Sequence, residues 1–423
     1  MPSLRETRSY SVERFHVSPG IPSAPGRHRL TDVDALRGIA VAMVVLAHVP
    51  ASLLWPPPDW MLPFVPMLAI GVEIFFAISG FVIGRSLLPE LNSARTAATR
   101  WLDIRQFWIR RAWRLLPAAY LWLFVTCVLS VAIGGWFDSP AATLRSAGAS
   151  ILYLANVLLS YRFQHGLYPG PLFHYWSLSL EEQFYFVVPF LILLPRRGLV
   201  WLLVIGMPIA CAVGDRYLGG FRVEELICGL LLALCEGHPY MLGIMRRLKA
   251  VRRPLGPVLS LATLIVVTQL ARIGLNSAFA VFWLARLGVA IASTALVLFA
   301  ATDHGLLVGR GRVYRALLWL GRRSYSIYLV HICAFFCTKE LTVWIGLSNG
   351  MRGAEGPLTC LIGLILLAVF AEPTYRFVET SVRRKMAKPH EFQPSLPSGV
   401  NWQGQIPPAP GHSGGRRGST QGS

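Results

Sequence analysis

Charged residues are scarce in this chain of 423 residues. Only 14% are Asp, Glu, Lys or Arg, whereas a soluble globular protein carries about 25%. Apolar residues make up 54% of the chain. This composition excludes a disordered segment, a collagen-like fibre and a coiled coil, and it is not that of an ordinary cytosolic enzyme. It indicates apolar helices inside a membrane.

Acidic residues are scarcer than basic ones. Asp and Glu total 21 against 40 Lys and Arg, which gives a formal net charge of +19. Such an excess can mark a nucleic-acid binder when it forms one patch, but here the basic residues lie in short stretches between apolar runs. Basic loops between membrane helices face the cytoplasm. The charge therefore predicts a multi-pass protein of the plasma or inner membrane, with no nucleic acid as partner.

Paired cysteines are also missing. All seven cysteines lie inside apolar stretches, and none belongs to a Cys-x-x-Cys pair. Cysteines in such positions behave as small apolar residues rather than as disulfide partners or zinc ligands. We therefore predict no metal site.

The apolar runs predict the membrane topology, because a span needs about 20 mostly apolar residues. An eleventh apolar patch, 148–160, is short, and counting it as a span would place the basic cluster 246–253 outside. We expect it to lie on the surface or to re-enter. The prediction is an all-α, polytopic membrane helix bundle of about ten transmembrane helices with both termini cytoplasmic. The ten candidate spans are 38–56, 62–88, 115–135, 184–196, 198–213, 223–237, 255–272, 278–301, 315–338 and 357–378.

Both ends of the chain are polar. Residues 1–30 contain no apolar signal-peptide segment and are expected to form a flexible cytoplasmic tail. Residues 386–423 are rich in Pro, Gly and Ser, which predicts a disordered tail. The membrane domain is expected to span 31–385.

Polar groups inside the first two spans are the first functional candidates, because ionisable groups at membrane depth are costly unless paired or solvated. Arg37 and His48 are three helical turns apart and share a face, about 16 Å apart along the axis. Arg37 could hold a phosphate-bearing cytoplasmic ligand, and a neutral His48 could accept a proton. The alternative is an arginine reaching lipid headgroups and a histidine bonded to a neighbouring helix. Glu73, in the second span, could orient His48.

Further polar groups cluster at the ends of later spans. Arg111 and Arg114 share a helical face at the predicted cytoplasmic mouth, where they suit a polyphosphate or, equally, lipid headgroups. Several other polar residues predict a central hydrophilic cavity, which a transporter would also have. These candidates for the cavity or an acceptor site are His174, Ser177, Glu181, Glu182, Tyr328 and His331.

Seven stretches in order resemble the acyltransferase 3 family of integral-membrane acyltransferases, and they cover about 31–385. Two positions differ from the family pattern: Glu73 stands where Asp is expected, and Thr380 where Pro is usual. The stretches are DALRGIA from Asp34 through His48, FFAISGF from Phe75, RRAWRLLP from Arg110, HYWSL from His174 through Tyr185, RVEEL from Arg222, Gly321 through SYSIYLVH ending at His331, and YRFVE from Tyr375.

The resemblance implies a ten-helix domain that moves an acyl group, commonly acetyl, from cytoplasmic acyl-coenzyme A (acyl-CoA) to an acceptor hydroxyl, with no bound cofactor. It ties Arg37 and His48 to donor handling and catalysis. Arg111 and Arg114 would help hold the donor phosphates, and His48 would be the general base oriented by Glu73. A covalent acyl-enzyme stays open, with His331 and Glu182 as reserve candidates.

The resemblance leaves the acceptor open among sugar-containing molecules. Cell-envelope polysaccharide, lipid-linked sugar and glycosylated metabolites all fit. It also implies a bacterial cell membrane as the location. Two readings from other classes compete: a multi-pass transporter or flippase of an acyl or glycan substrate, and a non-catalytic scaffold.

Overall fold

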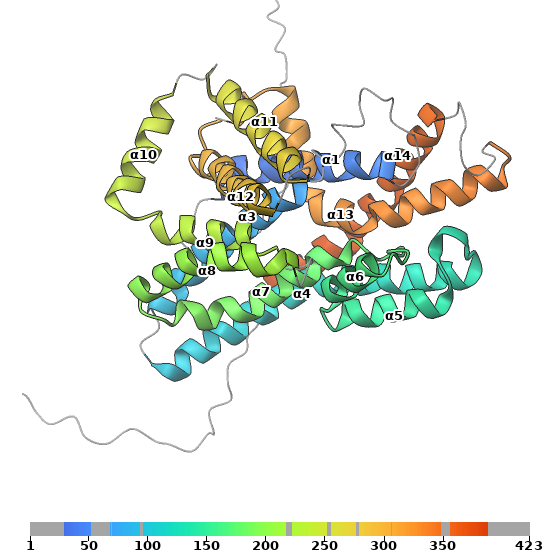
Figure 1. Ribbon diagram of the computed structural model, residues 1–423, viewed down its shortest axis with the longest axis horizontal. Coiled ribbons are helices and arrows are strands. Elements are labelled where there is room, and N and C mark those ends of the chain that lie inside the picture. Colours follow the sequence, from blue (N-terminus) through green and yellow to red (C-terminus); the bar gives the residue numbers. More distant parts are fainter. Residues whose placement is uncertain are drawn as a thin grey trace, which may run out of the picture. The chain divides into compact units, whose positions relative to one another are not determined.

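Helices make up all the regular structure of the computed structural model, which describes residues 29–51, 68, 70–93, 96–216, 222–251, 255–275, 279–305, 307–347 and 356–387. These residues contain no strand, so the predicted all-α class is confirmed for them (Figure 1). The predicted tails lie outside them, apart from 29–30 and 386–387. In chain order the elements are α1 (Thr31–Ala51), α3 (Gly71–Ser93), α4 (Ala97–Ala132), η2 (Gly135–Phe137), α5 (Pro140–Ile151), α6 (Ala155–Gln164), α7 (Tyr175–Ile192), α8 (Arg196–Arg216), α9 (Glu224–Cys235), α10 (Pro239–Ala250), α11 (Leu255–Leu275), α12 (Phe279–Ala301), α13 (Arg312–Trp344), α14 (Gly356–Pro373), the π-helix η3 (Thr374–Glu379) and α15 (Thr380–Ala387).

Six stretches of the described helices are long and apolar enough to cross a membrane. A seventh is possible if α9 and α10, which meet at a bend of 97°, form one broken span. A multi-pass membrane protein is therefore supported, whereas the count of ten helices and the side of each terminus stay predictions. The six stretches are 71–92, 97–132, 255–272, 282–301, 312–344 and 356–385.

Two segments differ from their expected form. The basic stretch before residue 115, expected as a loop, is the first half of α4, a single helix of 36 residues that begins with a capping box at Thr96. The apolar patch 148–160 is broken between α5 and α6, which have 12 and 10 residues. Neither helix is long enough to span, so this patch does not form one transmembrane helix.

The helices α1 and α13 run in the same direction, and glycines let them approach closely. A Cβ atom on Gly38 would lie 2.1 Å from the Leu317 carbonyl oxygen, and one on Gly321 would lie 1.7 Å from that of Asp34. Only glycine fits at such contacts, as in other close helix pairs of membrane proteins. Gly80 and Gly229 play the same part between α3 and α9.

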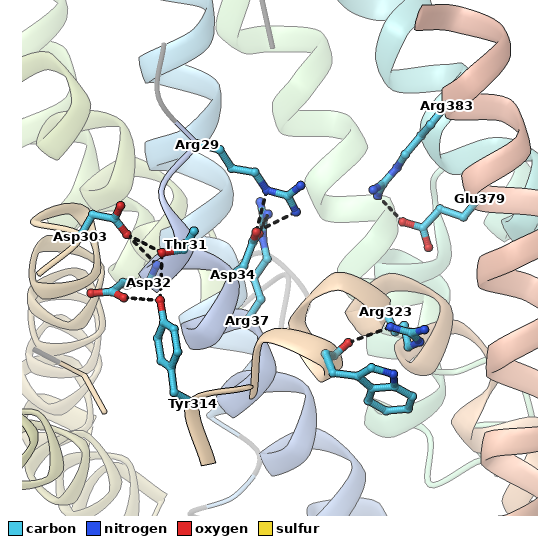
Figure 2. Close-up of polar contacts among 11 residues, drawn as sticks. Arg29, Thr31, Asp32, Asp34, Arg37, Asp303, Tyr314, Arg323, Glu379 and Arg383 are labelled. Carbon is cyan, nitrogen blue, oxygen red and sulfur yellow. Dashed lines mark hydrogen bonds and ion pairs between the residues drawn. The ribbon is translucent and has the colours of Figure 1, made fainter. Parts of the chain in front are cut away.

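Buried polar contacts anchor the start of α1, as Figure 2 shows. Asp32 is fully buried and accepts hydrogen bonds from the Tyr314 hydroxyl at 2.7 Å and from the Gly305 amide at 2.7 Å. Thr31 donates to Asp303 at 2.9 Å. These bonds fix α1 against α13 and the end of α12, and so fix the axial position of every polar group that α1 carries.

Candidate active site

Three histidines from three different segments meet near the end of α1. The ring centroids of His48 and His331 are 4.9 Å apart, and those of His331 and His174 are 5.3 Å apart. His331 lies on α13, and His174 immediately precedes α7. His174 and His331 are 3% and 0% exposed, whereas His48 is partly exposed. All three histidines were candidate site residues from the sequence, and the structure brings them together.

Backbone carbonyls determine which nitrogen of each ring carries a hydrogen. Nδ1 of His48 lies 2.8 Å from the Val44 oxygen, and Nδ1 of His331 lies 2.5 Å from the Tyr328 oxygen. In His174 the bonded atom is Nε2, 3.1 Å from the Leu329 oxygen. A carbonyl oxygen only accepts, so each of these nitrogens is the donor and the other one keeps a free lone pair. Within the described residues, no group of His, Cys, Asp and Glu is arranged as a metal site.

Glu73 has a partner other than the expected one. Its Oε1 accepts a hydrogen bond from Arg222 at 3.0 Å, while the Nδ1 of His48 is held by the Val44 carbonyl. The tautomer of His48 is thus set by its own helix, four residues back, rather than by Glu73. The Arg222 guanidinium also lies 5.8 Å from the Trp176 ring centre. Nothing in the spacing of Glu73 and Arg222 along the chain indicates that they meet, so this pairing was not predicted.

Hydroxyl groups hold the segment around His174 against α13. The Tyr328 hydroxyl lies 3.0 Å from the His174 carbonyl oxygen, to which it donates, and 2.5 Å from the Ser177 hydroxyl. Both residues were predicted as cavity candidates. Their contacts show that they position the backbone that carries His174.

The predicted basic residues form a second cluster, between α1 and α4. Arg37 lies within electrostatic range of Arg111 and Arg114. Arg37 is bonded to Asp34 at 3.3 Å, and Asp34 also accepts from Arg29 (Figure 2). Within the described part of the chain, Arg111 and Arg114 form no ion pair. The Nε of Arg114 is buried with no hydrogen-bond partner.

Two carboxylates of α7 border this basic cluster. Glu181 accepts hydrogen bonds from Ser79 at 2.6 Å and from Tyr185 at 3.1 Å, and it lies within electrostatic range of Arg37 and Arg111. The Oε1 of Glu182 is buried without a partner. Both residues, predicted as candidates for the cavity or an acceptor site, lie within electrostatic range of Arg111.

One basic residue of this cluster was missed. Arg383 on α15 lies within electrostatic range of Arg37 and Arg114, and it pairs with Glu379, as Figure 2 shows. Glu379 also accepts a hydrogen bond from Ser326 on α13 at 2.8 Å. Glu379 ends the π-helix η3, a conformation frequent at functional sites. The four-residue spacing of Glu379 and Arg383 was the available signal.

The basic cluster and the histidine cluster lie at two levels of the same helix. Arg37 and His48 are three turns apart on α1, about 16 Å along its axis. A small pocket beside the histidines is lined by Ser146, Ser150, Arg162 and Phe173, among others. The Phe173 ring centroid lies 5.5 Å from that of His48. The site thus has cations at one end and imidazoles at the other.

Comparison with known proteins was informative. The sequence model of one family, described as an acyltransferase domain, matches residues 30–371. YrhL of Bacillus subtilis is 32% identical over 392 residues, which cover 84% of this chain and 55% of that protein. The peptidoglycan O-acetyltransferase OatA of Listeria monocytogenes is 29% identical over 387 residues, covering 85% and 56%. The O-acetyltransferase OatA of Staphylococcus aureus is 28% identical over 404 residues, covering 87% and 60%.

This chain therefore spans somewhat more than half the length of these curated relatives. No solved structure matches it.

Proposed function

Because the chain belongs to the acyltransferase 3 family, as the resemblance of its motifs predicted, we propose that it transfers an acetyl group from cytoplasmic acetyl-CoA to a hydroxyl of a cell-envelope glycan. The acetyl group and the glycan class follow the three relatives, all of which are named O-acetyltransferases, two of them of peptidoglycan. The observation that carries the proposal is the pair of polar clusters, one of arginines and one of histidines, at two levels of α1.

The basic cluster is the proposed donor site. The phosphates of CoA need cations, and Arg111 and Arg114 are arginines without an ion pair in the described residues. Arg37 beside them completes a three-arginine cluster. Arginine binds phosphate oxygens through two parallel hydrogen bonds, so this cluster suits a diphosphate.

His48 is the proposed general base. Its Nδ1–H is tied to Val44, so Nε2 is free to take the proton from the acceptor hydroxyl. The acceptor oxygen forms a bond to the acetyl carbon while the bond from that carbon to the CoA sulfur breaks. The proton held by His48 then passes to the sulfur, which leaves as the thiol of CoA. Base assistance of this kind contributes about 10²–10⁴-fold to the rate.

The test uses the purified protein in lipid nanodiscs with acetyl-CoA labelled in the acetyl group. The acceptor is the peptidoglycan disaccharide of N-acetylglucosamine and N-acetylmuramic acid. We expect label in the disaccharide, and its loss in His48→Ala with protein yield unchanged. Label that crosses a vesicle membrane without joining the disaccharide would instead identify a transporter.

The donor site has its own matched variants on α4. Arg111→Ala or Arg114→Ala should raise the KM for acetyl-CoA roughly 10- to 150-fold, the equivalent of losing one charge-assisted hydrogen bond of about 1.5–3 kcal/mol. Arg105→Ala, an exposed arginine of the same helix, is the control and should leave that KM unchanged. Equal effects of all three substitutions would contradict the assignment.

A further inference from the structure

The histidine cluster offers hydrogen-bond acceptors but no donor. Each of the three rings uses its only N–H on a backbone carbonyl. The remaining nitrogens, Nε2 of His331 and Nδ1 of His174, are buried and have no hydrogen-bond partner. A buried acceptor without a donor is unfavourable, and native interiors rarely leave one without a reason.

Two such atoms from different segments, next to a third imidazole, are a specific arrangement. His331 lies between the other two rings, with centroid distances of 4.9 Å to His48 and 5.3 Å to His174. In its neutral form, each ring donates to its backbone carbonyl on one side and presents an acceptor nitrogen on the other. A molecule with several O–H or N–H groups complements these acceptors.

We propose that His174 and His331 bind the acceptor together with His48, each accepting a hydrogen bond from it. This inference rests on the proposed function and adds to it a specificity: the site selects a hydroxyl that is flanked by a second donor. One hydroxyl can satisfy only one of the three nitrogens. A sugar, with neighbouring hydroxyl or amide groups, can satisfy the others.

The surroundings indicate the direction of approach. The arginines that would hold the donor lie about 16 Å away along α1. The pocket that Phe173 shares with Ser146, Ser150 and Arg162 is small and mostly apolar, so it does not hold a sugar. The acetyl group would reach His48 from the arginine side of α1.

The tautomers allow variants that remove the proposed contact and keep the structural one. The side-chain amide of Asn matches Nδ1 of histidine in position, and that of Gln matches Nε2. His331→Asn can therefore still donate to the Tyr328 carbonyl, and His174→Gln can still donate to the Leu329 carbonyl. Each variant removes the acceptor nitrogen of the proposed contact and keeps the bond to the backbone. His165→Asn is the matched control, since exposed His165 bonds the Tyr161 carbonyl in the same way, at 2.8 Å.

We expect His331→Asn and His174→Gln each to raise the KM for the peptidoglycan disaccharide about 5- to 150-fold, as a lost buried hydrogen bond does. The KM for acetyl-CoA should stay within error of the wild-type value. The wild-type protein should also acetylate 1,3-propanediol faster per hydroxyl than 1-propanol, and His174→Gln or His331→Asn should reduce this preference. His165→Asn should change none of these values.

If both histidine variants keep the wild-type KM for the disaccharide, the inference is overturned and the proposed function still stands. An equal rise in the acetyl-CoA KM would also overturn it. Calorimetric titration of the disaccharide without any donor separates the two proposals. If the wild-type protein binds the disaccharide and the two variants do not, the inference holds even where no transfer from acetyl-CoA is found. If all three proteins bind it equally, the inference fails.

Discussion

The close contact of α1 with α13 makes Gly321 the most informative single position for linking packing to activity. Gly321→Ala would place a Cβ atom 1.7 Å from the Asp34 carbonyl oxygen, although real Cβ contacts are essentially never below 3.0 Å. The clash is with backbone on both sides, so no side chain can rotate away from it. The two helices must move apart.

The size of that movement sets the expected effect. The helices must separate by more than about 1 Å, and a displacement of that size in a catalytic geometry costs roughly 100-fold in rate. α1 carries Arg37 and His48, and α13 carries His331, so the separation alters both clusters at once. Overpacking of this kind also destabilises the fold by about 1–3 kcal/mol.

The measurement combines thermal unfolding in detergent with acetyl transfer to the peptidoglycan disaccharide. Gly206→Ala is the control, because Gly206 lies inside α8 with nothing within 4 Å of the added atom. That variant should keep its activity and gain up to about 1 kcal/mol from helix propensity. A Gly321→Ala protein with wild-type melting and wild-type kcat would refute the reasoning.

Three further substitutions test the buried charges. Arg286→Met should destabilise the protein by about 3–5 kcal/mol because it leaves fully buried Glu224 without its cation, and adding Glu224→Gln should restore most of the melting temperature. Asp32→Asn should cost about 1–3 kcal/mol in unfolding free energy, measured by thermal unfolding, because an NH2 group replaces one of the two oxygens that accept hydrogen bonds from Tyr314 and Gly305. Arg383→Ala should raise the acetyl-CoA KM less than the loss of an unpaired arginine does, because Glu379 already neutralises it; a larger rise would place Arg383 in direct contact with the donor.

Local spacing explains what the sequence could predict. The position of Arg37 three turns before His48 depends only on helix geometry, and the apolar runs are long enough to require helices. The arginines of α1 and α4 do come together, while the roles of the candidate residues stay predictions. The patch 148–160 was predicted not to span the membrane. The break at 152–154 itself was not predicted, because the turn between α5 and α6 has no Pro or Gly to indicate it.

Tertiary packing explains what the sequence could not predict. Glu73 was expected beside His48, but the two helices present these side chains to different neighbours, and Arg222 receives the carboxylate. Such a choice depends on the rotation of α3 against α1. α3 meets α1 at Gly71, where an added Cβ atom would lie 2.4 Å from the Ala40 carbonyl oxygen, and no periodicity shows this contact. The meeting of the three histidines also depends on tertiary packing, because the rings come from three segments.

The distribution of ion pairs gives the basic excess of this chain a second meaning. Inside the bundle, Arg222, Arg286 and Arg323 each have a carboxylate partner, as an arginine between membrane helices requires. Arg111 and Arg114 form no ion pair among the described residues, although both are partly exposed and Arg111 lies within electrostatic range of Glu181 and Glu182. The Nε of Arg114 is buried with no hydrogen-bond partner, and a buried donor without an acceptor is costly. Under the proposed function, a phosphate of the donor would bind this pair of arginines and supply that acceptor.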